Sequence, residues 1–267
     1  MLMEKAIDIH AHYGDPECFP QKGLEKEFLT LSPEQLKAIY DRCDICAGCF
    51  SPMEALFPAN AEMLCAANAC TAETAEKHSW FYQWAVVNPL YPASYRQAEE
   101  LLKQPKCVGV KIHPDANDYN LEDYADELFS FCAQHHAVLL SHSGEKFSLP
   151  EKFVPFADKY PNVNIITAHI GCGSDGQLDH QLNAVASARN GNIYTDASSV
   201  KSILNHIIEY AVTKVTSEKI LFGSDTPLHH AAMMKARIDC ADITSADRAN
   251  ILTNTALHLL PKLQNMK

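Results

Sequence analysis

The 267-residue sequence is short of positive charge. It has 22 lysines and arginines against 33 aspartates and glutamates, which gives a formal net charge of −11. A protein that binds nucleic acid needs clustered Lys and Arg side chains to contact the phosphates. The composition therefore argues against a nucleic-acid partner and favours a small molecule as substrate.

Long apolar runs are also missing. A transmembrane helix needs about 18 or more consecutive apolar residues, and no such run occurs. The N-terminal segment MLMEKAIDIHAH lacks the apolar stretch of a secretory signal. We therefore expect a cytoplasmic protein that does not associate with membranes.

The ten cysteines do not indicate a disulfide framework, because the sequence shows no secretory signal. Cys43, Cys46 and Cys49 form a CxxCxxC run, but no fourth cysteine is spaced to complete a metal site. The run reads better as part of a buried strand, with Cys43 and Cys49 on one face and Cys46 on the other.

Eight short apolar runs recur along the chain, and each is followed by a polar loop and a segment of helical periodicity. The runs are 5–12, 44–50, 81–87, 107–113, 137–142, 162–169, 192–197 and 219–225. This alternation is typical of parallel strands with crossover helices, and the chain length is close to the roughly 250 residues of a (β/α)8 barrel. The sequence predicts an α/β protein with a single TIM-barrel domain over residues 1–267.

The segments between the runs read as helices. Ser32 is a candidate N-cap, followed by a proline at the first helical position and by Gln35 as the partner in a capping box, for a helix through Tyr40. The other predicted helices are 59–78, 94–104, 121–136, 150–160, 175–189, 199–213 and 244–260.

A His-x-His pair ends the first predicted strand. His10 and His12 are separated by one residue, so an ideal strand points both side chains to the same face. The pair alone is weak evidence for a metal site. It gains weight because His142, His169 and Asp225 also stand at the ends of predicted strands. In a barrel these ends converge, and imidazole and carboxylate groups are ligands for a divalent ion.

Several short motifs together resemble the amidohydrolase superfamily, specifically its amidohydrolase-related family, which also contains aminocarboxymuconate-semialdehyde decarboxylase. The resemblance covers nearly the whole chain. Its motifs, in chain order, are IDIHAH, VGVKIHP, SHSG, AHIG, YTDAS, GSDTP and NILTNTALHLL.

The resemblance implies that His10, His12, His142 and Asp225 bind one divalent metal. Asp225 would also act as the general base, and His169 would contact the metal-bound water or the substrate. Zn²⁺ is the most favoured ion, and Mn²⁺, Fe²⁺ and Co²⁺ tolerate the same ligands. The resemblance also implies a homodimer.

Four further residues are candidates for substrate contact or for support of the ligands. Lys111 corresponds to a lysine that is carboxylated and bridges two metals in binuclear members, but we favour one metal because Lys111 lies two residues before His113 and so deeper in the barrel. It could instead pair with an aspartate or orient the substrate. Asp8 is expected on the same face as His10 and one layer deeper. His113 and Asp196 are read either as substrate contacts or as structural residues.

The leading functional expectation is hydrolysis of a C–N or C–O bond in an amide, ester or lactone by a metal-activated water. A non-oxidative decarboxylase of an aromatic or enol carboxylate is the alternative. Such an enzyme usually holds the carboxylate with arginine, and none of the five arginines lies near the end of a predicted strand. A barrel that binds metal without catalysis is the third reading. Specificity is expected from the loops 13–30, 51–60 and 114–120.

Overall fold

A computed structural model describes residues 5–14, 28–29 and 31–266 of the chain. Eight parallel strands form one sheet in chain order. The strands are β1 (Ala6–Tyr13), β2 (Ile45–Pro52), β3 (Phe81–Val86), β4 (Cys107–Ile112), β5 (Val138–Ser141), β6 (Ile165–Thr167), β7 (Ile193–Asp196) and β8 (Ile220–Leu221).

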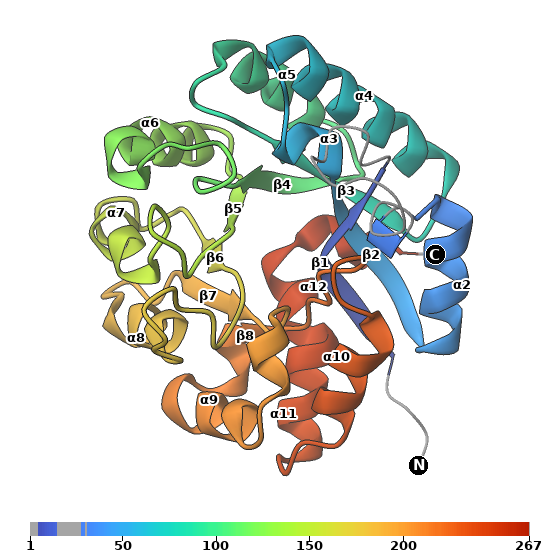
Figure 1. Ribbon diagram of the computed structural model, residues 1–267, viewed down its shortest axis with the longest axis vertical. Coiled ribbons are helices and arrows are strands. Elements are labelled where there is room, and N and C mark those ends of the chain that lie inside the picture. The colour runs from blue at the N-terminus through green and yellow to red at the C-terminus, as the bar shows by residue number, and fades with distance from the viewer. Residues whose placement is uncertain (1–4, 15–27, 30, 267) are drawn as a thin grey trace.

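Backbone hydrogen bonds join the first strand to the segment of β8 and the residues after it. Ile9 N–H donates to the Phe222 carbonyl at 3.0 Å, and Asp225 N–H donates to the His10 carbonyl at 2.8 Å. The strands therefore surround a common centre, with helices on the outside (Figure 1). The predicted (β/α)8 barrel is confirmed.

The helices follow the strands in the expected alternation. They are α2 (Pro33–Arg42), α3 (Met53–Leu56), α4 (Ala61–Lys77), α5 (Pro92–Leu102), α6 (Leu121–Gln134), α7 (Val154–Lys159), α8 (His180–Ser187), α9 (Ile207–Val215), α10 (Ala231–Asp239), α11 (Ser245–Ala249) and α12 (Thr255–Leu259). Short 3-10 helices are η2 (Pro150–Phe153), η3 (Val200–Ile203), η4 (Ser217–Lys219) and η6 (Pro261–Asn265), and η5 (Asn250–Asn254) is a π-helix.

Local sequence signals explain α2 well. Ser32 accepts a hydrogen bond from the backbone of Gln35, and the Gln35 side chain accepts one from the backbone of Ser32. This capping box satisfies backbone N–H groups that the first turn of a helix leaves without a partner. Leu36 and Tyr40 are buried, so one face of the helix packs on the barrel.

Several predicted elements differ in extent, and two of them bear on the site. The predicted helix 244–260 is interrupted by the π-helix η5, and its residues form α11, η5 and α12 in turn. The predicted strand 219–225 contains only the two residues of β8, so Asp225 stands in the segment beyond the strand. Apolar periodicity in the sequence locates helical and strand segments, but it does not show where the backbone hydrogen-bonding pattern changes within them.

The barrel interior is filled by apolar side chains, among them Ile9, Trp84 and Leu140. The Trp84 indole N–H donates to the Ile9 carbonyl at 2.8 Å. The pairing of β1 with β2 is irregular between Asp8 and Ala11. The strict alternation of side chains expected for β1 is therefore broken at Ile9 and His10.

The described cysteines are all free thiols. Cys49 of β2 lies in the barrel interior, but Cys43 ends α2 and packs in the core outside the barrel, so the predicted placement of these two cysteines on one strand face was wrong. Across residues 5–14, 28–29 and 31–266, no helix is long and apolar enough to cross a membrane.

Candidate active site

A small cavity of about 80 Å³ lies where the carboxyl ends of the strands meet. Loops at this end of a TIM barrel carry the catalytic groups in characterised enzymes. Its lining comes from seven of the predicted polar residues and from four apolar residues. These are His10, His12, Lys111, His113, His142, His169 and Asp225, with Met53, Leu56, Phe57 and Leu228.

The histidine pair of β1 meets Asp225 in this cavity. The Asp225 Oδ1 atom lies 2.9 Å from His12 Nε2 and 3.6 Å from His10 Nε2. All three side chains are at least nine-tenths buried. One carboxylate oxygen and two imidazole nitrogens, each from a different side chain, thus lie within 4.8 Å of one another.

The opposite ring nitrogens of both histidines are held by other groups. His10 Nδ1 lies 2.9 Å from Asp196 Oδ2, and His12 Nδ1 lies 3.2 Å from the Ser51 carbonyl oxygen. Because a carbonyl and a carboxylate accept hydrogen bonds, both Nδ1 atoms donate. The lone pairs are then on the Nε2 atoms, which is the tautomer that a metal ligand needs.

Asp225 has a backbone conformation that few non-glycine residues adopt. Its φ angle is 58°, in the left-handed region, and its N–H is fixed by the His10 carbonyl. Such strained residues cluster at functional sites. Burial raises the pKa of Asp225, but the close contact with His12 and the nearby imidazoles outweigh this effect and hold its pKa below the usual range. The carboxylate is therefore charged.

His142 and His169 form a second pair in the cavity, and the ring of His169 also lies 4.9 Å from that of His10. His142 Nδ1 lies 3.1 Å from His169 Nε2, and His169 Nδ1 lies 2.7 Å from Ser198 Oγ. The Ser198 hydroxyl donates to Asp196, so its oxygen accepts from His169, and His169 Nε2 accepts from His142. This chain of hydrogen bonds leaves the lone pair of His142 on Nε2, a buried atom that has no hydrogen-bond partner among the described residues.

The ligand atoms of His142 do not lie within the group formed by His10, His12 and Asp225. Its Nε2 is 3.6 Å from Glu145 Oε1, and these two residues can be grouped with Asp115 as a second set of metal donors. The four ligands implied by the resemblance thus line one cavity, with three in one group and His142 beside them.

Lys111 lines the cavity and is not too deep in the barrel to take part. Its Nζ lies 2.8 Å from His10 Nε2, and its side chain is almost fully buried. Burial lowers the pKa of Lys111 to about 8, although the charges of Asp225 and Asp196 oppose the shift. Burial, together with the charge of Lys111, lowers the pKa of His10 to about 4 and keeps this imidazole neutral.

The two remaining aspartates lie outside the cavity. Asp196 supports the site, because its carboxylate binds His10 Nδ1 and also accepts from the His169 backbone N–H at 2.9 Å. Asp8 does not share a face with His10, which corrects our expectation. Its carboxylate accepts from Tyr40 of α2 at 2.7 Å and from the Ser224 backbone at 3.0 Å. The irregularity in β1 after Asp8 explains the change of face.

The donor set fits a divalent metal. Hydrogen bonds at the Nδ1 atoms of His10 and His12 orient these two neutral imidazoles beside the Asp225 carboxylate. His142 Nε2 provides a further buried nitrogen without a hydrogen-bond partner in the described part of the chain.

A family model described as Amidohydrolase matches residues 7–262. The chain belongs to the amidohydrolase family. No curated protein matches the sequence.

Solved structures share the fold of this amidohydrolase at low sequence identity. The 2,6-dihydroxybenzoate decarboxylase from Rhizobium has a TM-score of 0.79 and 14% identity, covering 98% of this chain and 100% of its own. The 5-carboxyvanillate decarboxylase from Sphingomonas paucimobilis has a TM-score of 0.78 and 13% identity, covering 96% and 99%. A dihydroxybenzoic acid decarboxylase from Polaromonas sp. JS666, solved with manganese and 2-nitroresorcinol, has a TM-score of 0.78 and 14% identity, covering 97% of both chains.

Sequence reasoning missed several residues of the amidohydrolase site. Ser51 and Ser198 bind the histidine rings, but a serine next to a strand end gives no signal of its own. Three apolar lining residues, Met53, Leu56 and Phe57, come from the predicted specificity loop 51–60. Most of the other predicted loop, 13–30, lies outside the described residues.

His229 lies beside the donor group, whereas the other histidines are placed away from it. His230 caps α10, where its Nδ1 accepts from the Ala232 N–H, and His229 Nε2 is 3.8 Å from Asp225 Oδ2. The histidines predicted on helices, namely His78, His135, His136, His180, His206 and His258, lie on helices or at their ends.

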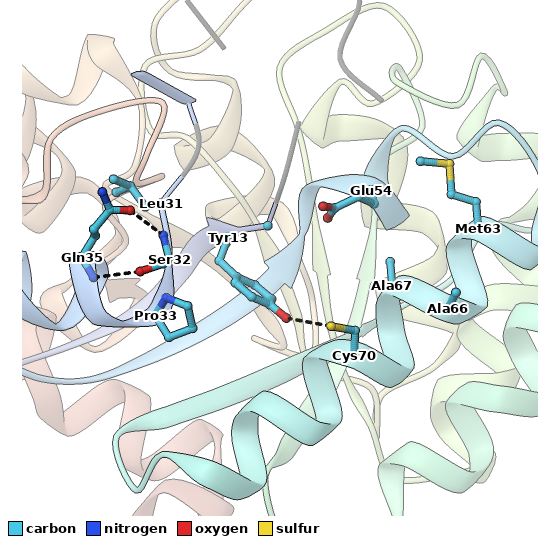
Figure 2. Close-up of a pocket in the computed structure, with 11 residues that line it drawn as sticks. Tyr13, Leu31, Ser32, Pro33, Gln35, Glu54, Met63, Ala66, Ala67 and Cys70 are labelled. Atoms are coloured by element: carbon cyan, nitrogen blue, oxygen red, sulfur yellow. Dashed lines mark hydrogen bonds between the residues drawn. The ribbon is translucent and has the colours of Figure 1, made fainter. Parts of the chain in front are cut away.

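A larger cavity of about 620 Å³ lies beside the site, between the end of β1 and the helices α2 and α4 (Figure 2). Tyr13 follows the histidine pair, but its hydroxyl points to α4, where it is 3.2 Å from Thr74 Oγ1. The walls are mainly apolar and contain none of the histidines. We therefore place the chemistry in the smaller cavity.

Proposed function

We propose that the protein is a divalent-metal-dependent decarboxylase of a small, flat carboxylic acid, either aromatic or enolic. The observation that carries this proposal is the position of Lys111, a buried cation beside the donors His10, His12 and Asp225. A substrate carboxylate that loses its hydrating waters in a buried site needs a positively charged partner. The names of the structural neighbours support decarboxylation over the hydrolysis expected from the sequence.

The shape of the cavity agrees with such a substrate. Its lining combines polar groups, namely the imidazoles, Lys111 and Asp225, with apolar surface from Met53, Leu56, Phe57 and Leu228. A flat acid can place its carboxylate toward Lys111 and its apolar body against these side chains. The size of the cavity favours a small substrate.

The metal would be held by Nε2 of His10, Nε2 of His12 and the Asp225 carboxylate, with His142 Nε2 as a further donor. When bound, a divalent ion supplies positive charge that stabilises negative charge developing on substrate oxygens. Both Zn²⁺ and Mn²⁺ suit these ligands; a structural neighbour was solved with bound manganese.

The protein groups account for the rest of the reaction. Lys111 neutralises and orients the carboxylate before the bond breaks. The C–C bond then breaks, its electron pair stays on the substrate carbon, and the carboxylate leaves as CO₂. One proton must replace it, and Asp225 is placed to pass a proton from the solvent or from a substrate hydroxyl to that carbon. His169, bonded to Ser198, holds His142 in place.

Hydrolysis of a lactone or amide is the second candidate. Lys111 is the only Lys or Arg on the cavity wall among the described residues. Arg189 and Arg237 pair with carboxylates elsewhere, and Arg248 donates to backbone carbonyls. Hydrolysis by a metal-activated water does not require a cation that binds a substrate carboxylate. A cavity wall that carries one lysine and no arginine among the described residues is therefore also compatible with hydrolysis.

A paired screen separates the two reactions. Protein loaded with Zn²⁺ or Mn²⁺ is incubated with hydroxybenzoates and enol acids, with CO₂ detection, and in parallel with lactones and amides. We expect CO₂ from at least one acid, with loss of activity after chelation and recovery when the metal is restored. Turnover of lactones or amides without any CO₂ release would replace the proposal by hydrolysis. Bound metal without turnover in either panel would favour a non-catalytic barrel.

A further inference from the structure

His113 stands on the cavity wall two residues after Lys111, and its hydrogen bonding fixes its tautomer. Its Nδ1 accepts a hydrogen bond from the Ala116 backbone N–H at 3.1 Å. An imidazole nitrogen that accepts carries no proton, so the proton of this neutral ring is on Nε2. Nε2 makes no hydrogen bond with any residue in the described part of the chain.

The orientation of the His113 ring is also fixed. The ring stacks on His142 with 4.0 Å between centroids and 9° between planes, and Phe57 lies 5.8 Å away. Asn117 donates to the His113 carbonyl through both its backbone N–H and its side chain. The Nε2–H group is therefore held rigidly on the wall of the cavity.

This tautomer excludes His113 as a metal ligand. A nitrogen needs a free lone pair to coordinate a metal. In His113 the Nδ1 lone pair accepts the hydrogen bond from the Ala116 N–H, and Nε2 carries the proton. What remains is a donor that can bind an oxygen atom of a ligand in the cavity.

We propose that His113 is a substrate-binding residue whose Nε2–H donates to a second oxygen function of the substrate, distinct from the carboxylate that Lys111 binds. This inference rests on the proposed function and names its substrate class. Lys111 and His113 both line the cavity, so Lys111 Nζ and His113 Nε2 offer two separate donors to one ligand. An acid with a hydroxyl or second carboxyl group across a ring matches them.

The experiment compares probes and variants in protein loaded with Zn²⁺. Calorimetry measures the Kd of benzoate, which has one oxygen function, and of 3-hydroxybenzoate and benzene-1,3-dicarboxylate, which have two. His113→Phe keeps a ring to stack on His142 but has no donor, whereas His113→Gln keeps an N–H near the Nε2 position without the ring. Metal content and Tm are measured for each protein.

We expect the wild type to bind the two-function probes about tenfold or more tightly than benzoate. A hydrogen bond to a charged or strong acceptor contributes a binding free energy of that size. His113→Phe loses this preference with full metal content, and His113→Gln retains most of it. Nitrogen NMR of the wild type shows the His113 proton on Nε2.

Several results would overturn the inference. These are equal binding of all probes by the wild type, binding of none, an undiminished preference in His113→Phe, or a proton on Nδ1. Loss of metal in His113→Gln but not in His113→Phe would make His113 a positioning residue for His142 instead. The proposed function fails separately: binding as expected without CO₂ release from any acid contradicts decarboxylation and leaves the role of His113 standing.

Discussion

The two sides of the active-site cavity differ in how completely their polar atoms are paired. On the side of β1, β7 and β8, which we call the metal side (His10, His12, Asp196 and Asp225), the histidine nitrogens and both carboxylates have partners. On the side of β4 and β5, which we call the substrate side (Lys111, His113 and His142), the Nε2 atoms of both histidines make no hydrogen bond within the described residues.

This difference shows how one cavity can serve two purposes. Ligands that hold an ion must be oriented before it arrives, and the hydrogen bonds of the metal side do this. Groups that bind an incoming ligand must keep donors or lone pairs available, and the substrate side does so, with His113 Nε2–H open to a substrate and His142 Nε2 open to the metal as its further donor. Lys111 joins the two sides, because it belongs to β4 and contacts His10.

The largest effect should come from the centre of the metal side. Asp225→Asn preserves shape but removes the charge and the proton-transfer group. We expect the turnover number to fall by about 10³-fold, within the range for loss of a general acid or base, as measured with the best acid from the screen. A fall of less than tenfold in a fully metal-loaded variant would remove Asp225 from the chemistry.

The next effect tests the support behind His10. Asp196→Asn weakens the acceptor that fixes the His10 tautomer, and we expect metal affinity to fall about 10- to 100-fold, measured by titration against a chelator. Asp8→Asn is the matched control, because Asp8 is equally buried but contacts Tyr40, Ser224 and only the backbone N–H of His10, not its ring. It should lower the Tm and leave metal affinity close to wild type. Equal metal affinity in both variants would contradict the assignment of Asp196.

Lys111→Met tests the boundary between the two sides. It keeps the length of the side chain and removes the cation, so we expect the KM for an acid substrate to rise about tenfold or more, the worth of a hydrogen bond to a charged group. Metal content should not change. If the variant instead loses metal, Lys111 belongs to the metal side, as the lysine of a binuclear centre would.

The smallest effect is expected for Ser51→Ala. The Ser51 hydroxyl lies 3.0 Å from His12 Nδ1, but the backbone carbonyl of the same residue also accepts from this nitrogen. The substitution leaves that carbonyl in place, so metal affinity should change by less than about threefold. A change as large as that of Asp196→Asn would show that the side chain of Ser51, and not its backbone, orients His12.

The sequence predicted the barrel because its signals are local. Apolar runs and helix caps such as Ser32 with Gln35 depend on near neighbours in the chain, and eight repeats of one pattern leave few possible architectures. The convergence of His10, His142, His169 and Asp225 followed from the barrel, since all stand at or just beyond the carboxyl ends of strands.

The contacts that determine the role of each site residue could not be predicted from local sequence signals. Asp8 lies on a different face of β1 from the one expected because the strand is irregular. The hydrogen bond from Ser198 to Asp196 joins residues whose roles depend on partners far away in the chain. The stacking of His113 on His142 likewise brings two strands together. Tautomers and open donors arise from three-dimensional contacts, and they separate the metal side from the substrate side.

Anomalous diffraction from a crystal soaked in Mn²⁺ tests the central claim most directly. The account predicts a manganese peak bonded to Nε2 of His10, Nε2 of His12 and a carboxylate oxygen of Asp225. A peak held only by Asp115, His142 and Glu145, or only by His10, His169 and Asp196, the two other sets of donors among the described residues, would contradict it.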